Sequence, residues 1–105
     1  MNIKEYKAMG CFDAMQLAEI KAGIDKGVAV EIYAKPEFNW GQMREIYYGL
    51  VENLDVSWYA KPEFECEQMQ EILYGLEDNK MVSRYADPKI SAEEMKQIRL
   101  SLNSR

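Results

Sequence analysis

The chain has 105 residues, of which 48% are hydrophobic and 30% are charged, and its formal net charge is -5. This length suits a single domain, and this balance is typical of a globular chain and excludes an intrinsically disordered one. No apolar run approaches the roughly 20 residues of a membrane-spanning helix, and the N-terminus "MNIKEYKAMG" has no hydrophobic stretch of the signal-peptide kind, so we expect a cytoplasmic protein.

The predicted elements are all helical, so the predicted fold class is all-α. The N-terminal segment "NIKEYKAM" occupies the register of the short helical turns that recur later in the chain, and we predict a somewhat longer helix there. Four long helices are predicted at about 14–26, 40–52, 66–78 and 92–103. Three short helical turns are predicted between them, at 30–34, 56–60 and 82–86, and the proline that follows each turn ends it.

The same text recurs every 26 residues without a gap, as the spacing of Tyr33, Tyr59 and Tyr85 shows. One amphipathic helix of this length is marginally stable alone, whereas stacked copies cover one another's apolar stripes. We therefore predict one domain, 1–105, of tandem 26-residue helical repeats, each a long helix plus a short helical turn, stacked as a short solenoid or a compact bundle. The predicted units are about 2–27, 28–53, 54–79 and 80–105.

Capping residues mark both ends of the long helices. The N-cap positions carry Asp13, Asn39, Glu65 and Ser91. Three residues later come Gln16, Gln42, Gln68 and Glu94, which is the spacing of a capping box. Three of the helices are predicted to stop at residue types that tolerate the left-handed conformation of a helix end, namely Gly27, Asn53 and Asn79.

A small residue recurs near the end of each long helix, as Gly23, Gly49, Gly75 and Ser101. Glycine inside a helix costs ~1 kcal/mol relative to alanine. We therefore predict that another backbone or an aromatic ring packs closely against this position. The recurring tyrosine is predicted to be a core residue whose hydroxyl is satisfied near the surface.

Departures from the repeat distinguish the outer units from the middle ones. One helix position carries Lys21, Tyr47, Leu73 and Arg99 in the four units. The linker position of Trp58 carries Arg84 in the last unit. Terminal repeats need polar outer faces for solubility, so we expect the array to be closed at its C-terminal unit.

Five residues are candidates for binding a protein partner: Trp40, Arg44, Tyr48, Trp58 and Tyr74. The caps and the apolar stripe of the repeat require none of the four aromatic rings. Tyr48 is predicted to lie near Arg44 on the helix surface, and Tyr74 repeats this placement in the next unit. Aromatic and arginine side chains together are typical of binding hot spots. The alternative is that these rings pack on neighbouring units.

The sequence has no catalytic, metal or cofactor motif, so we expect no enzymatic activity. It has no histidine, which is the commonest general base and metal ligand. Paired carboxylates such as Glu93 and Glu94 lie at helix starts, where they complement the helix dipole. Cys11 and Cys66 have no metal or redox spacing, and we expect both thiols to be reduced and packed.

The negative charge is concentrated in the middle of the chain. Residues 39–80 hold three basic and nine acidic groups, whereas residues 81–105 hold five basic and three acidic ones. This distribution argues against direct contact with nucleic acid. A solvated acidic face is the simpler interpretation, and an acidic surface that mimics DNA is the alternative.

The stretch "DVSWYAKPEFECEQMQEILYGLE" resembles a short helical repeat found in uncharacterised bacterial proteins, often encoded on plasmids, phages or conjugative elements. The tyrosine-alanine-proline linker, the glutamine-methionine helix start and the glycine-leucine helix end carry this resemblance. It covers about residues 12–102, and the final unit is the most divergent. The resemblance implies a bacterial intracellular setting and a mobile-element context, and it implies no activity.

The architecture predicts a non-enzymatic module that binds a protein partner through the exposed aromatic positions of the two middle units. The alternative is a small acidic inhibitor, encoded on a mobile element, of a host defence protein or a nucleic-acid-binding protein. Self-association would use the same surface. We expect no cofactor, no direct contact with nucleic acid and no membrane association.

Overall fold

The computed structural model describes residues 1–103, and within that range it contains five α-helices and three single-turn 3-10 helices. The α-helices are α1 (Ile3–Ala8), α2 (Ala14–Lys26), α3 (Trp40–Val51), α4 (Cys66–Glu77) and α5 (Ala92–Ser101). The 3-10 helices are η1 (Val30–Ile32), η2 (Val56–Trp58) and η3 (Val82–Arg84). The prediction of an all-α fold is confirmed. The last two residues of the predicted unit 80–105 lie outside the described range.

The long helices begin at the predicted residues, but three of them end earlier than predicted. Helices α3 and α4 end one residue early and α5 ends two residues early. The asparagines that follow α3 and α4, Asn53 and Asn79, adopt the predicted left-handed conformation with φ of 58° and 54°. The residue before each asparagine has already left helical geometry. Helix α5 stops because Leu102 is extended, with ψ of 145°.

The predicted N-caps Asp13 and Asn39 fix the starts of α2 and α3. Asp13 Oδ1 accepts a hydrogen bond from the Gln16 N–H at 2.8 Å. Asn39 Oδ1 accepts in the same way from the Gln42 N–H, also at 2.8 Å. The side-chain oxygen of each glutamine accepts a hydrogen bond from the backbone N–H of the N-cap residue, which completes the capping box. The backbone therefore enters each of these helices from one defined direction.

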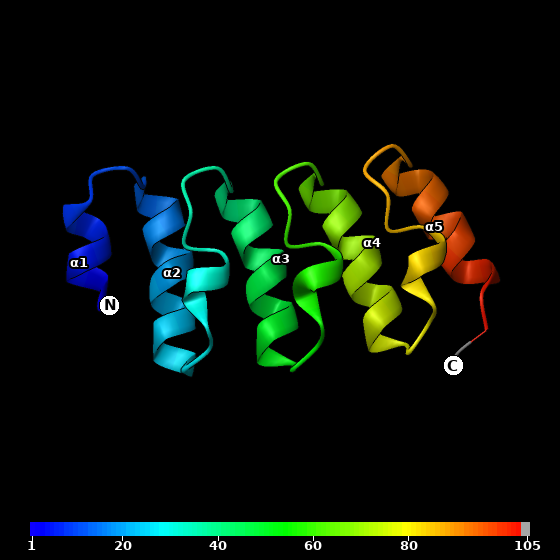
Figure 1. Ribbon diagram of the computed structural model, residues 1–105, viewed down its shortest axis with the longest axis horizontal. Helices are drawn as coiled ribbons and strands as arrows, with labels where there is room; N and C mark the ends of the chain where they lie inside the picture. The colour runs from blue at the N-terminus through cyan, green and yellow to red at the C-terminus, as the bar shows by residue number, and fades with distance from the viewer. Residues whose placement is uncertain (104–105) are drawn as a thin grey trace.

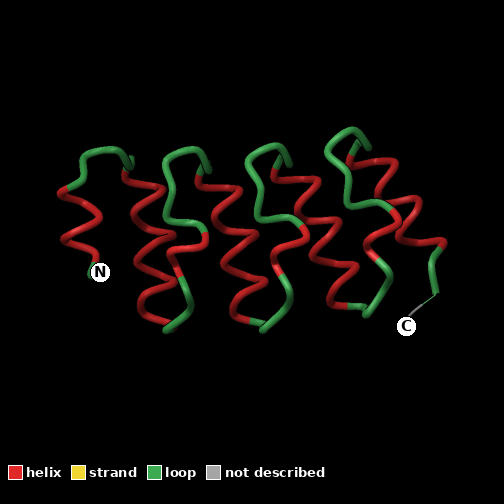
Figure 2. The backbone as a smooth tube through the Cα atoms, in the orientation of Figure 1, coloured by secondary structure: helices red, strands yellow, loops and turns green. Residues whose placement is uncertain are grey.

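The five α-helices lie side by side in chain order, and each contacts the next (Figure 1). The molecule is elongated along this row, with extents of 45 × 24 × 16 Å. Each 3-10 helix packs against the α-helix that precedes it. The three linkers follow similar paths, as the tube in Figure 2 makes clear. Surface side chains on neighbouring helices can therefore meet along the sides of the row.

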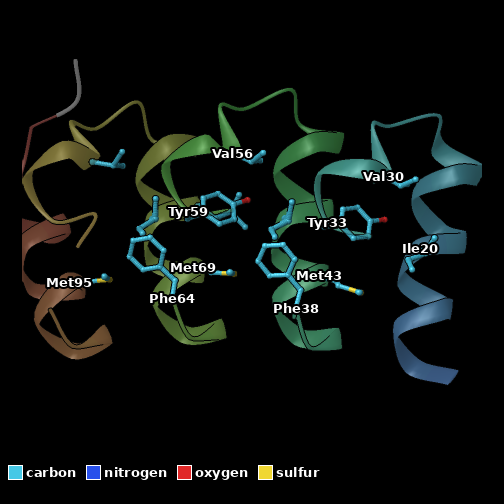
Figure 3. Packing of buried hydrophobic residues seen from close by; sticks show 14 of the residues in the cluster. Ile20, Val30, Tyr33, Phe38, Met43, Val56, Tyr59, Phe64, Met69 and Met95 are labelled. Carbon is cyan, nitrogen blue, oxygen red and sulfur yellow. The ribbon is translucent and has the colours of Figure 1, made fainter. Parts of the chain in front are cut away.

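One apolar core runs through the row (Figure 3). Phe38, Met43 and Ile46 are at most 1% exposed, so the predicted stripe faces inward. The residues 26 positions later are equally buried, namely Phe64, Met69 and Ile72. Burial of the same sequence positions in consecutive segments places the successive helices against each other in a similar way.

The recurring glycine of each helix packs against the recurring tyrosine of the linker that follows it. The hydroxyls of Tyr33, Tyr59 and Tyr85 each donate a 2.6 Å hydrogen bond to a backbone carbonyl of the preceding helix. A Cβ atom on Gly49 would overlap the Tyr59 hydroxyl and lie 2.5 Å from Val56 Cγ1. The prediction that a ring packs against the glycine is therefore confirmed, and the tyrosine hydroxyl is satisfied inside the fold.

The capping glutamines have a second role that the capping box does not explain. The side-chain NH2 of Gln42 donates to the Phe64 carbonyl oxygen at 2.7 Å and to the Pro62 carbonyl oxygen at 3.1 Å. Gln16 and Gln68 make the corresponding bonds to later linkers. Each of these buried amides thus ties the start of one helix to the linker that leads into the next helix.

The C-terminal unit uses its basic residues for contacts with α4 and α5. Arg99 Nε donates to Glu71 Oε1 at 2.9 Å, in an ion pair whose side chains are only 13% and 12% exposed. Lys80 Nζ donates to the Arg99 carbonyl oxygen at 2.9 Å and so satisfies a backbone acceptor at the end of α5.

The prediction that both thiols are packed is wrong for Cys11. Both are free, but Cys11 is exposed because it lies in the loop between α1 and α2.

Candidate partner-binding surface

Two of the predicted partner-binding residues, Tyr48 and Tyr74, lie together in one groove between α3 and α4. Each tyrosine is 37% exposed. The groove has a volume of about 310 Å³, and Val51 and Leu73 complete its apolar wall. We call this feature the α3–α4 groove. Its remaining wall is polar and consists of Glu45, Glu52, Gln70 and Glu77.

An arginine side chain lies over each of the two tyrosine rings. Arg44 Nε donates to the Tyr48 hydroxyl at 2.7 Å, and the guanidinium carbon lies 5.6 Å from the ring centroid. The guanidinium carbon of Arg99 lies 5.4 Å from the centroid of Tyr74. Because these contacts restrict the rings before any partner arrives, little side-chain entropy is lost when a partner covers them.

Three carboxyl groups give the groove its charge. Burial raises the pKa of Glu45, which is 5% exposed, and its carboxylate accepts a weak hydrogen bond from the Cys66 thiol at 3.9 Å. A hydrogen bond with the Glu52 carboxyl group raises the pKa of Glu77 to about 7, and burial and the neighbouring negative charges act in the same direction. No lysine or arginine lines the α3–α4 groove among the described residues.

We predict that Glu77→Gln stabilises the protein above pH 7. The folded-state pKa of about 7 exceeds the ordinary value of 4.5, so between these values the folded chain binds more protons than the unfolded one. The free energy of unfolding therefore falls as the pH rises through this window. Glutamine does not ionise, and its advantage should reach about 1 kcal/mol above pH 7, because solvent screens this exposed site.

Urea unfolding near pH 4, 6 and 8 measures this effect. The matched control is Glu63→Gln, which removes an exposed carboxylate from a linker and should change little across the same range. A stability difference for Glu77→Gln that is equal at all three pH values would contradict the shared proton between Glu52 and Glu77.

Trp40 and Arg44 line a second groove that adjoins the first. This groove has a volume of about 580 Å³, and Gly41, Cys66 and Glu67 also contribute to it. Glu45 lines both grooves. Trp40 is 42% exposed. Four of the five predicted residues therefore lie on or beside the α3–α4 pair, although Arg99 rather than Arg44 accompanies Tyr74.

Trp58 is exposed, as predicted, but it lies apart from the other four residues. It is the last residue of η2 and is 39% exposed. It lines neither the α3–α4 groove nor the groove beside Trp40. The prediction of one binding surface therefore combined four residues of α3 and α4 with one residue of a linker.

The sequence interpretation missed the carboxylates of the groove. Glu45, Tyr48 and Glu52 are spaced by three and four residues, which places them on one side of α3. Glu77 lies three residues after Tyr74 on α4. Helical spacing could have indicated these residues, but it could not show that the two sets face each other.

Comparison with known proteins assigns no family, because no family model, no curated protein and no solved structure matches the chain. None of the helices among the described residues has the length and apolar character needed to cross a bilayer. Residues 1–103 also contain no cluster of three histidine, cysteine, aspartate or glutamate side chains able to hold a metal ion.

Proposed function

We propose that this chain is a protein-interaction module of tandem 26-residue helical repeats, stacked as a short solenoid. It binds a protein partner through the α3–α4 groove and performs no chemistry of its own. The regular spacing of the helix starts at Ala14, Trp40, Cys66 and Ala92 supports the repeat assignment. So does the recurrence of the tyrosine, glycine and glutamine contacts between successive segments.

The observation that carries the proposal is the pair of exposed, arginine-bound rings in one groove. Tyrosine and arginine are over-represented among residues that dominate binding energy. The positions equivalent to Tyr48 and Tyr74 in the outer units are Ala22 and Leu100, so the rings belong to the two middle units alone. The fold therefore does not require an aromatic side chain at this position, and a binding role accounts for it.

Affinity capture with the intact chain as bait tests the proposal. We expect the double variant Tyr48→Ala/Tyr74→Ala to lose at least about 90% of a specifically captured protein, since alanine at hot spots commonly costs more than 2 kcal/mol. The matched control is Leu100→Ala, which removes an exposed apolar side chain, 57% exposed, from the same repeat position on α5. Equal capture by both variants would contradict a role for the groove.

A further inference from the structure

We infer that the partner presents a basic amphipathic helix to the α3–α4 groove. A lysine or arginine of that helix lies between the carboxyl groups of Glu52 and Glu77, and its apolar side chains pack on the rings of Tyr48 and Tyr74. This inference rests on the proposed function and specifies the chemistry of the partner.

Charge is the first argument for a basic partner. The groove places three carboxyl groups around apolar walls and has no lysine or arginine in its lining, and three basic residues of α3, α5 and the preceding linker make other contacts. Arg44 is bound to the Tyr48 hydroxyl, and Arg99 is paired with Glu71. Lys80 is bound to a backbone carbonyl at the end of α5. Since none of these cations lines the groove itself, we infer that the cation that complements its carboxyl groups comes from the partner.

The burial of Glu45 is the second argument. This residue is only 5% exposed, yet it forms no ion pair within residues 1–103, and its hydrogen-bond donor is a thiol 3.9 Å away. A buried carboxylate is unfavourable unless a cation or strong donors satisfy it. Arg44 lowers the pKa of Glu45, but burial outweighs this effect, so a cationic side chain from the partner would stabilise the carboxylate further.

The pair formed by Glu52 and Glu77 is the third argument. Two carboxyl groups that share a hydrogen bond must retain a proton, and an ammonium or guanidinium group between them would replace it. Arginine would also stack on the tyrosine rings through cation–π contact. Partner binding is thus expected to release a proton near neutral pH.

The groups that face Glu77 allow this release. From α3 these are Glu45 and Glu52, and from α4 itself Asp78, all of which are acidic and favour retention of the proton in the free protein. Tyr59, which follows η2, stays neutral because burial and then the charges of Glu45, Glu52 and Glu77 raise its pKa. On α5 the basic group is Arg99, which is paired with Glu71.

The shape of the groove favours a helix as the occupant. The lining residues span positions 45–52, at the C-terminal end of α3, and positions 70–77 of α4, so about two turns of a helical ligand, roughly 12 Å, can lie along them. An amphipathic helix places apolar anchors at intervals of three and four residues, and the apolar groove residues of α3, Tyr48 and Val51, are likewise three residues apart. Polyanionic nucleic acid is disfavoured by the same carboxylates.

Calorimetric titration of the full chain with three synthetic helical peptides tests this inference. The probes are 14-residue peptides with leucine at intervals of three and four and with arginine, glutamine or glutamate between the leucines. We expect the arginine peptide to bind at least about tenfold more tightly than the glutamine peptide, and the glutamate peptide not to bind. In buffers of different ionisation enthalpy at pH 7, binding of the arginine peptide should release a fraction of one proton.

Two variants make the test specific. Glu52→Gln/Glu77→Gln should weaken binding of the arginine peptide about tenfold and abolish proton release, whereas the control Glu63→Gln should change neither. Equal binding of the arginine and glutamine peptides would overturn the inference, as would binding that the double variant does not affect. Self-association through this groove, detected by sedimentation and abolished by the double variant, would overturn it too, because the occupant would then be a second copy.

Failure of this inference can be separated from failure of the proposed function. If the glutamine peptide binds as well as the arginine peptide and Tyr48→Ala/Tyr74→Ala abolishes both, the groove is a binding site with no preference for cations. If affinity capture is insensitive to the tyrosine variants, the proposed function itself fails, whatever the peptides do.

Discussion

Replacement of Gly49 with alanine is expected to lower the free energy of unfolding by about 2 to 3 kcal/mol. A methyl group at this position would overlap the Tyr59 hydroxyl and press on Val56, so η2 would have to move away from α3. That movement would also weaken the 2.6 Å hydrogen bond from the Tyr59 hydroxyl to the Glu45 carbonyl oxygen. The intrinsic preference of a helix for alanine, about 1 kcal/mol, offsets only part of the loss.

Thermal unfolding measures this effect, and the chain supplies a control at the same repeat position. Ser101 occupies the place of Gly49 in α5, where it is exposed and no described 3-10 helix follows. Ser101→Ala should therefore change stability by less than about 0.5 kcal/mol, as is usual for surface substitutions. A Gly49→Ala protein as stable as the parent chain would show that tyrosine and glycine are not in tight contact.

A Gln42→Glu variant is expected to lose about 3 kcal/mol of stability at neutral pH, although the two side chains have nearly the same shape. The amide nitrogen of Gln42 donates to the carbonyl oxygens of Phe64 and Pro62 in a buried site. A carboxylate there would replace two donors with a negative charge that faces two acceptors. The capping bond to the Asn39 N–H would survive, so the loss isolates the contact between segments.

The pH dependence of this variant identifies the cause. The introduced carboxyl group should have a raised pKa in the folded state, so its destabilising effect should be largest at high pH and should shrink as the pH falls and the group takes up a proton. The matched control is Glu94→Gln in the last unit, where the side chain is exposed and should tolerate the exchange. Denaturant unfolding of both variants at acid and neutral pH provides the measurement, and equal losses for the two would contradict our interpretation.

Much of the fold could be predicted because its signals are local. Capping residues such as Asp13 and Asn39 mark where helices begin, and Asn53 and Asn79 mark where two of them end. These effects depend on neighbours within a few residues, so spacing along the chain is sufficient to predict them. The early end of α5 was missed because the residue equivalent to Asn79 is Arg105, a residue type that does not mark a helix end.

The role of the glutamines could not be predicted from the capping box alone, since glutamate caps a helix as well as glutamine does. The signal was present in a difference between units. Gln16, Gln42 and Gln68 each precede a further linker and long helix among the described residues, whereas Glu94 does not. Only the amide carries donors for the next linker, and the contact spans more than 20 residues of sequence, beyond the reach of local patterns.

The candidate site could be predicted only in part for the same reason. Exposure of Tyr48 and Tyr74 follows from their place on each helix, and it is observed. Their position in one groove with Glu52 and Glu77 depends on how α3 packs against α4. Trp58 was grouped with them although its linker position was predicted, because spacing along the chain does not show which exposed residues share one surface.

The most direct test of a binding role for the α3–α4 groove is a nuclear magnetic resonance titration of the isotope-labelled chain with the captured partner. We predict that the largest backbone amide shifts occur at Tyr48, Val51 and Tyr74. Little change is expected at Ser57 and Ala60, which line a separate groove beside η2. Shifts centred on Ser57 and Ala60, with Tyr48 and Tyr74 unaffected, would contradict the proposal.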